Sequence, residues 1–228
     1  MNKDPVNRID LRSDTVTQPT KAMRAEIGNA ELGDDVLGDD PTVQALQKQL
    51  ATLLDKEDAL LVASGTMSNA IAIRTHTQPG DEIITEINSH IYIYEGGGYA
   101  ALSGCSVALV QGTRGIMDAE DVATAIRKSE GSLSHFPNGR LVCVENTSNR
   151  GGGTCYPQET LDEIAKVAHA NECNAHMDGA RLFNAVISTG VNAARMVRDY
   201  DSISICLSKG LGAPVGSVLV GSSEFFRT

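Results

Sequence analysis

The sequence predicts an α/β fold with a mostly parallel sheet and helices on both faces, and three observations support this prediction. Short apolar runs alternate along the chain with stretches whose apolar residues recur at helical spacing. Several runs are apolar without interruption, as expected of parallel strands that are buried on both faces. The 22 glycines supply the tight turns that many short elements require. The 228 residues are enough for one sizeable core.

Seven short apolar runs are expected to form strands. The first precedes a Ser-Gly-Thr turn, and the fourth reads Leu-Val-Cys-Val-Glu. Their continuous apolar character favours strands in the interior of a sheet. The seven expected strands are residues 59–63, 82–87, 106–110, 141–145, 175–178, 202–207 and 217–220.

Three stretches between these runs have the spacing of helices. Residues 41–54 place apolar side chains at helical intervals and begin with Pro41, which is favoured in the first turn of a helix. Residues 118–128 and 157–170 follow the same pattern, and the polar residues 129–138 are expected to form a loop.

Composition excludes several classes of partner. The formal net charge of −10 at pH 7 argues against nucleic acid, which needs a basic surface. No apolar run is long enough to cross a bilayer, and the polar, charged residues 1–11 do not resemble a signal peptide. The five cysteines contain no Cys-x-x-Cys pair, which favours reduced, buried thiols. We therefore expect a cytoplasmic protein without a membrane or nucleic-acid partner and without a metal.

The segments that directly follow the expected strands hold most of the unusual residues. Ligands of open α/β sheets bind beyond the carboxyl ends of the strands, so chemistry is expected in these segments. They are residues 64–69, 88–98, 146–154, 178–181 and 208–212.

Gly65 and Thr66 stand where an expected strand turns into a helix. The helix N–H groups, the helix dipole and the Thr66 hydroxyl together suit a phosphate group. The same Ser-Gly-Thr sequence is also an ordinary helix cap, so this signal alone is weak.

Asp178 and Lys209 follow two consecutive expected strands. A carboxylate at the first position would keep a pyridinium nitrogen protonated, and a lysine at the second would form an imine. Each also has a plain structural reading, as a helix-capping aspartate and as a solvated loop lysine. Their convergence with the expected phosphate site at one sheet edge favours pyridoxal 5′-phosphate as the cofactor.

Five motifs make the sequence similar to the threonine aldolase family, which consists of fold-type I pyridoxal-phosphate enzymes. The resemblance runs from about residue 9 to about residue 227. The motifs are residues 11–17 (LRSDTVT), 33–36 (GDDV), 38–42 (GDDPT), 178–181 (DGAR) and 208–212 (SKGLG).

The resemblance implies a role for each cofactor-binding residue. Lys209 carries the cofactor as an internal aldimine, and Gly65 and Thr66 bind its phosphate. Asp178 holds the pyridine nitrogen, and Arg181 lies beside the cofactor.

The resemblance also implies the residues of the substrate side. Arg181 and Ser13 bind the substrate carboxylate, which fits arginine as a bidentate partner of carboxylates. His90 stacks on the cofactor ring, and His135 lines the substrate side. His90, His135 or a water held between them is the expected base.

The other three histidines are expected to be structural. His76 and His169 fall in helical patterns and are expected on the surface, while His176 lies inside an expected strand. His176 and Asp178 form a His-x-Asp pair, but no third metal ligand is evident in the sequence.

The implied activity is that of an aldehyde-lyase. It cleaves L-threonine, L-allo-threonine or related β-hydroxy-α-amino acids to glycine and acetaldehyde by retro-aldol cleavage of an external aldimine. The implied assembly is a homodimer or homotetramer. Relatives continue for roughly another hundred residues, so residues 1–228 are expected to be the cofactor-binding large domain without its small C-terminal domain, with an N-terminal arm at about 1–40.

Three alternatives remain open at this point. The chain could be another fold-type I enzyme, such as a β-eliminating lyase or an aminotransferase. It could be a weak or inactive remnant, because the small domain is missing. A nucleotide-binding oxidoreductase is disfavoured because no GxGxxG motif follows the first expected strand.

Overall fold

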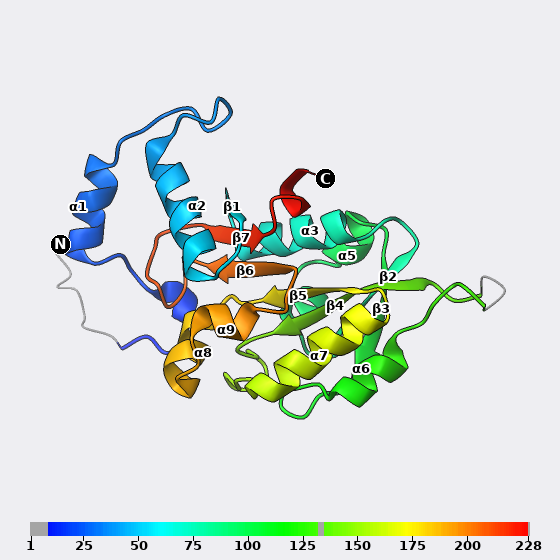
Figure 1. The fold of residues 1–228 in the computed structure, drawn as a ribbon. Helices are drawn as coiled ribbons and strands as arrows, with labels where there is room; N and C mark the ends of the chain where they lie inside the picture. Colours follow the sequence, from blue (N-terminus) through cyan, green and yellow to red (C-terminus); the bar gives the residue numbers. More distant parts are fainter. Residues whose placement is uncertain (1–8, 132–134, 228) are drawn as a thin grey trace.

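A computed structural model describes residues 9–131 and 135–227 of the chain. The described residues form one seven-stranded sheet in the order β1-β7-β6-β5-β4-β2-β3, shown in Figure 1. The strands are β1 (Asp58–Val62), β2 (Asp81–Glu86), β3 (Ser106–Val110), β4 (Asn138–Glu145), β5 (Asn174–Asp178), β6 (Ser202–Cys206) and β7 (Ser217–Gly221). All seven predicted strands are confirmed, with ends that differ by three residues at most.

The sheet is mostly parallel, as predicted, and β7 is the exception. The pairs β2–β3, β2–β4, β4–β5 and β5–β6 are parallel, whereas β7 is antiparallel to both of its neighbours, β1 and β6. Because both β1 and β6 are antiparallel to β7, these two strands run in the same direction. The apolar run of β7 resembles those of its parallel neighbours, so the sequence did not reveal its direction.

Helices cover both faces of the sheet, as predicted (Figure 1). One face carries α2, α6, α7, α8 and α9, and the other carries α3, α4, α5 and η2. The helices are η1 (Asp14–Val16), α1 (Lys21–Asn29), α2 (Pro41–Leu53), α3 (Gly65–His76), α4 (His90–Ile93), α5 (Gly98–Ala101), α6 (Ala119–Ala125), α7 (Gln158–Ala170), α8 (Leu182–Thr189), α9 (Ala193–Val197) and η2 (Phe225–Arg227).

Alternation along the central strands supplies a core on each face. Ile83 of β2 packs in a cluster with Ile73 of α3, whereas its neighbour Ile84 packs in the main core on the opposite face. β4 does the same with Leu141 and Val142. Successive strand side chains point to opposite faces, so a continuous apolar run is what a sheet covered on both sides requires.

Helix α6 is shorter than the predicted 118–128. After Ala125 the chain becomes extended, and Arg127 accepts a backbone hydrogen bond from Gly139 at 2.7 Å. A Cβ atom on Gly139 would lie 2.8 Å from the Arg127 carbonyl oxygen. This close approach to the start of β4 ends the helix, and the local sequence pattern does not contain that information.

His76 is only partly exposed, so its prediction as a surface residue is confirmed only in part. Its Nε2 atom lies 2.8 Å from the Ser202 hydroxyl, and its ring stacks at a tilt on Phe225 with centroids 4.8 Å apart. Both partners are distant in sequence, so helical spacing alone did not indicate this contact. His169 is exposed, as predicted.

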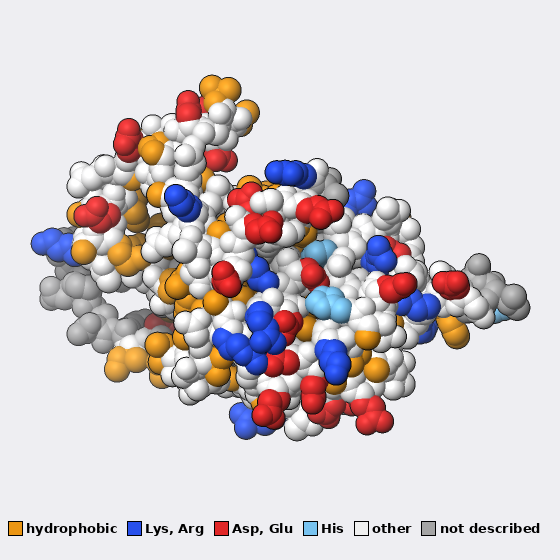
Figure 2. All heavy atoms as spheres, in the orientation of Figure 1, with side chains coloured by type: hydrophobic (Ala, Val, Ile, Leu, Met, Phe, Trp, Pro, Cys, Tyr) orange, Lys and Arg blue, Asp and Glu red, His pale blue; other side chains and the backbone are white. Residues whose placement is uncertain are grey.

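Residues 9–40 form an arm that extends from the sheet (Figure 1). Its helices η1 and α1 contain no buried residue. Figure 2 shows hydrophobic side chains on the projecting part of this arm at the upper left. Among the described helices, none is long and apolar enough to cross a membrane.

Candidate functional site

Six of the seven strands bring their carboxyl ends to one edge of the sheet. β3, β2, β4, β5 and β6 are parallel and lie side by side in that order, and β1 runs in the same direction as β6. The residues after these strands therefore share that edge, where α/β sheets bind their ligands. They include the start of α3, His90, Glu145, Asp178 and Lys209.

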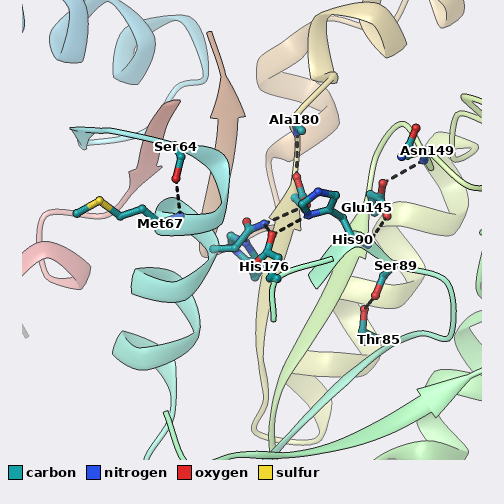
Figure 3. Close-up of polar contacts among 12 residues, drawn as sticks. Ser64, Met67, Thr85, Ser89, His90, Glu145, Asn149, His176 and Ala180 are labelled. Carbon is teal, nitrogen blue, oxygen red and sulfur yellow. Dashed lines mark hydrogen bonds and ion pairs between the residues drawn. The ribbon is translucent and has the colours of Figure 1, made fainter. Parts of the chain in front are cut away.

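The N-terminus of α3 is built for close approach to β6. The Ser64 hydroxyl accepts a hydrogen bond from the Met67 backbone at 3.1 Å, which caps the helix (Figure 3). A Cβ atom on Gly65 would lie 2.7 Å from the Cys206 sulfur, so only glycine fits there without a shift. Thr66 follows in the exposed first turn. The helix end, which attracts anions, thus lies beside the strand that leads to Lys209.

Asp178 ends β5 with its carboxylate fixed from two sides. It is 3% exposed, its Oδ1 accepts from the Ala180 backbone at 3.1 Å (Figure 3), and its Oδ2 accepts from Asn69 Nδ2 at 3.0 Å. Asn69 was not predicted as a site residue. Its position one helical turn after Gly65, on the face that meets the sheet, was the available signal.

Lys209 lies three residues after β6 and is half-buried. Its backbone carbonyl accepts a hydrogen bond from the Thr17 hydroxyl at 2.7 Å, which ties the arm to this loop. Its positive charge contributes to lowering the pKa of both His90 and Asp14, so the lysine lies near both groups.

His90 is paired with Glu95, a residue that sequence reasoning missed. His90 Nδ1 lies 2.8 Å from Glu95 Oε1, and Asn69 Nδ2 donates to the same oxygen at 2.8 Å. The hydrogen bond to Glu95 raises the pKa of His90, and burial raises the pKa of Glu95. The pair therefore keeps a proton on Nδ1 and leaves Nε2 for other contacts.

Glu145 is a second carboxylate that sequence reasoning did not single out. It ends β4 opposite Asp178 and accepts from the backbone N–H groups of His90 at 2.9 Å and Asn149 at 3.0 Å (Figure 3). Burial, followed by repulsion from Asp178, raises the pKa of Glu145 to about 7. Glu145 could have been singled out from the sequence, because it is a charged residue at the end of an apolar strand, where an unpaired charge is costly to bury.

The structure pairs Arg181 with Asp14 of the arm. Nε and one terminal nitrogen donate to the two carboxylate oxygens at 2.7 and 2.8 Å. This hydrogen bonding is the main reason that the pKa of Asp14 is lowered. Ser13 caps η1 and accepts from the Thr15 backbone at 3.2 Å, directly before Asp14.

The structure does not bring His135 to this site within one chain, so that expectation fails for a single chain. His135 is exposed and lies three residues before β4, whose far end carries Glu145. An eight-residue strand spans roughly 25 Å at ~3.3 Å per residue, which separates His135 from the carboxyl edge.

His90, Glu95 and Asp178 place their ligand atoms within 4.8 Å of one another. Such a group could hold a cation in principle. Here the imidazole already bonds to Glu95, and Asn69 donates to both carboxylates. The three groups therefore satisfy one another as a hydrogen-bonded network, with the lysine nearby as the counter-charge.

Comparison with protein families gives one match over residues 10–228, to the model described as beta-eliminating lyase. The chain is 47% identical over 221 residues to low-specificity L-threonine aldolase 1 of Arabidopsis thaliana. It is 40% identical over 220 residues to low specificity L-threonine aldolase of Escherichia coli (strain K12). Each alignment covers 96% of this chain, but only 62% and 64% of those relatives.

The fold is similar to that of the threonine aldolase of Leishmania major. The TM-score is 0.81 at 23% identity, over 93% of this chain and 62% of that one. The chain thus spans less than two thirds of the length of each of these three proteins.

Proposed function

This chain belongs to the beta-eliminating lyase family, and we propose that it is the pyridoxal-phosphate-binding domain of a threonine aldolase. The reaction is cleavage of L-threonine, L-allo-threonine or related β-hydroxy-α-amino acids to glycine and acetaldehyde. One observation carries the proposal: the start of α3, Asp178 and Lys209 converge at one sheet edge. The names of the relatives support the choice of reaction.

The residues at this edge fit the cofactor. The capped N-terminus of α3, with Gly65 and Thr66, would hold the phosphate, because the backbone N–H groups at the start of a helix bind anions. Asp178 would accept a hydrogen bond from the protonated pyridine nitrogen, and Lys209 would form the covalent link. When bound, the cofactor supplies an electron sink for the bond that breaks at the substrate Cα atom.

His90 is the candidate for both ring stacking and proton transfer. Its Nδ1 proton is held by Glu95, so Nε2 is the nitrogen that could receive the proton of the substrate β-hydroxyl, directly or through one water. Since His135 lies at the opposite edge of the sheet within one chain, we assign the base to His90, the histidine that a single chain brings to the site.

Arg181 and Ser13 would bind the substrate carboxylate. Arg181 Nε and one terminal nitrogen already bond to Asp14, so the guanidinium is held in a fixed orientation at the site. Its second terminal nitrogen and the exposed Ser13 hydroxyl are the donors that a carboxylate could reach.

An apolar arm supports the proposal of a homodimer or homotetramer. Exposed apolar side chains of this extent mark a protein–protein contact, and a second copy of the chain would bury them. The most exposed large apolar side chains of the arm are Ile9, Leu11, Leu32, Val36 and Leu37. Light scattering at several concentrations tests this point, and a concentration-independent monomer would contradict it.

We also infer a cytoplasmic protein that acts on a small amino-acid substrate. The five cysteines are all free, which fits a reducing compartment. The net charge of −10 disfavours nucleic acid as a partner.

Two alternatives have different products. Another fold-type I enzyme, such as a β-eliminating lyase or an aminotransferase, would release ammonia or exchange an amino group. A remnant without the continuation found in the relatives would bind cofactor and turn over slowly. Release of glycine and acetaldehyde from L-threonine distinguishes the first alternative, and its rate distinguishes the second.

The decisive experiment is trapping of the cofactor. The protein is mixed with pyridoxal phosphate, reduced with borohydride and mapped by peptide mass. We expect the label on Lys209, and Lys209→Ala should lose both the label and turnover, by at least about a thousandfold in rate. Lys56, whose ammonium group donates to the Arg198 and Tyr200 carbonyls, provides the control Lys56→Ala. A label on another lysine would contradict the assignment.

A further inference from the structure

A chain of buried hydrogen bonds runs from Asp178 through the interior to the opposite edge of the sheet. Asn69 Nδ2 bonds to Asp178 Oδ2 at 3.0 Å, and Asn69 Oδ1 bonds to His176 Nε2 at 3.1 Å. His176 Nδ1 lies 2.8 Å from the Ser202 hydroxyl, which lies 2.8 Å from His76 Nε2. Figure 3 shows His176 beneath the residues of the site.

The sheet itself places these groups in line. His176 and Asp178 are two residues apart on β5, so their side chains emerge on the same face. Ser202 of β6 is the register partner of His176. Asn69 and His76 come from α3, which covers this face. The first four links are at most 3% exposed, so water does not compete for their bonds: Asn69, Asp178, His176 and Ser202.

With His176 neutral, the donors and acceptors of the chain allow one direction. Asn69 gives its two N–H groups to the carboxylates of Asp178 and Glu95, so its oxygen must accept from His176 Nε2–H. A neutral His176 then accepts at Nδ1 from the Ser202 hydroxyl. That hydroxyl oxygen accepts in turn from His76 Nε2–H.

Burial supports the neutral state of both rings. It lowers the pKa of His176 and of His76 to about 4, so both are uncharged at neutral pH. Asp201 and Arg140 are the charged groups that act on His76, with opposite effects. Each donor in the chain therefore points toward Asp178, where the bond dipoles stabilise a carboxylate charge.

We propose that His176 and His76 are positioning residues, held as neutral Nε2–H tautomers, that act through Ser202 and Asn69 to fix and stabilise the Asp178 carboxylate. The proposal rests on the proposed function, in which this carboxylate meets the pyridine nitrogen. It extends the site to residues that touch neither cofactor nor substrate. The far end of the chain reaches a hollow of about 890 Å³ that is lined by His76, Arg74 and Arg140.

The first test needs no cofactor. Long-range ¹H–¹⁵N spectra of the unliganded protein, labelled at histidine, report the tautomer of each ring at neutral pH. We expect Nε2–H for both His176 and His76, with His76→Gln used to assign the second. An Nδ1–H tautomer or a charged ring at His176 would overturn the proposal. This result stands whether or not the protein binds pyridoxal phosphate.

The second test breaks the chain at its middle and uses a matched control on the same strand. Ser202→Ala removes the hydroxyl that joins the two rings. Ser204→Ala makes the same change at an equally buried position, where the hydroxyl has no hydrogen-bond partner among the described residues.

We expect Ser202→Ala to weaken pyridoxal-phosphate binding by up to roughly tenfold, the upper scale of one ordinary hydrogen bond, and to shift the absorption maximum of the bound cofactor. Ser204→Ala should stay within about twofold, because it removes no link of this kind. Equal effects of the two variants, or no effect of the first, would overturn the proposal. If the unmodified protein binds no cofactor, the proposed function fails, while the tautomers still decide the direction of the chain.

Discussion

The floor of the site and the N-terminal arm are held in different ways. The floor, formed by Asn69, His176 and Asp178, is nearly inaccessible to solvent, and its side chains bond to one another. The arm contributes Asp14, which bonds to Arg181 from helices without a buried residue. The floor is thus organised before any ligand arrives, whereas the arm depends on a few polar bonds or on further cover.

This difference suggests a division of labour. Electrostatic stabilisation requires groups that do not rearrange, and burial on a sheet provides them. Entry of a substrate requires a segment that can move. An arm that buries little apolar surface can move at a small cost in free energy.

Asp178→Asn should have the largest effect after loss of Lys209. The amide keeps the hydrogen bond from Ala180 but loses the charge that, in the proposed function, would face the ring nitrogen. We expect turnover of L-threonine to fall about a hundredfold or more. Asp199→Asn is the control, since that carboxylate pairs with Arg198 at the surface. Equal rates for the two variants would remove Asp178 from the mechanism.

The buried histidines should make the floor sensitive to acid. Burial lowers the pKa of His76 to about 4 in the folded state, against about 6.5 when unfolded. The folded pKa is the lower one, so the stabilisation is complete above pH 6.5 and is lost as the pH falls toward 4.

The variant His76→Gln isolates this contribution. Between pH 7 and pH 5, its free energy of unfolding should fall by about 2 kcal/mol less than that of the unmodified protein. Urea denaturation at the two pH values measures the difference. The raised pKa of Glu145 acts in the opposite direction, but it is common to both proteins and cancels. Parallel losses in the two proteins would show that His76 does not titrate in this way.

Asp14→Asn should have the smallest effect on global stability. It breaks the pair with Arg181, which joins the arm to the sheet edge. Because η1 and α1 bury no residue, we expect a change within about 1 kcal/mol in the free energy of unfolding.

The same variant should expose the arm to protease. Limited proteolysis should cleave residues 9–40 several times faster in Asp14→Asn, while the sheet stays intact. Asp10→Asn is the matched control, because among the described residues Asp10 pairs only with its neighbour Arg12 in the arm. Equal cleavage of both variants would mean that the pair with Arg181 does not hold the arm.

Much of the fold followed from the sequence because its signals are local. A continuous apolar run predicts a strand covered on both faces, and all seven runs are strands. The direction of β7 was missed because pairing direction depends on where the chain returns to the sheet. The early end of α6 was missed because Gly139, a distant residue, pairs with Arg127.

The site was predictable in part for the same reason. Asp178, Lys209, His90 and the start of α3 each follow a strand, and parallel strands bring such positions to one edge. Glu95 and Asn69 were missed because their roles exist only as contacts between α3, α4 and β5. His135 was placed wrongly for a single chain, since loops at the two ends of one strand look alike in sequence.

By itself, the sequence determined the layered fold, and it indicated the edge expected to carry the chemistry and the residues expected to bind the cofactor. Helical periodicity and the ends of strands depend on residues that are close in sequence, so they can be recognised from the sequence alone. Only the tertiary structure decided which polar groups pair: Asp14 with Arg181, Glu95 with His90, and Asn69 with both His176 and Asp178. Hydrogen bonds act over about 3 Å, so pairs from distant segments are fixed only when the packed core brings those segments together.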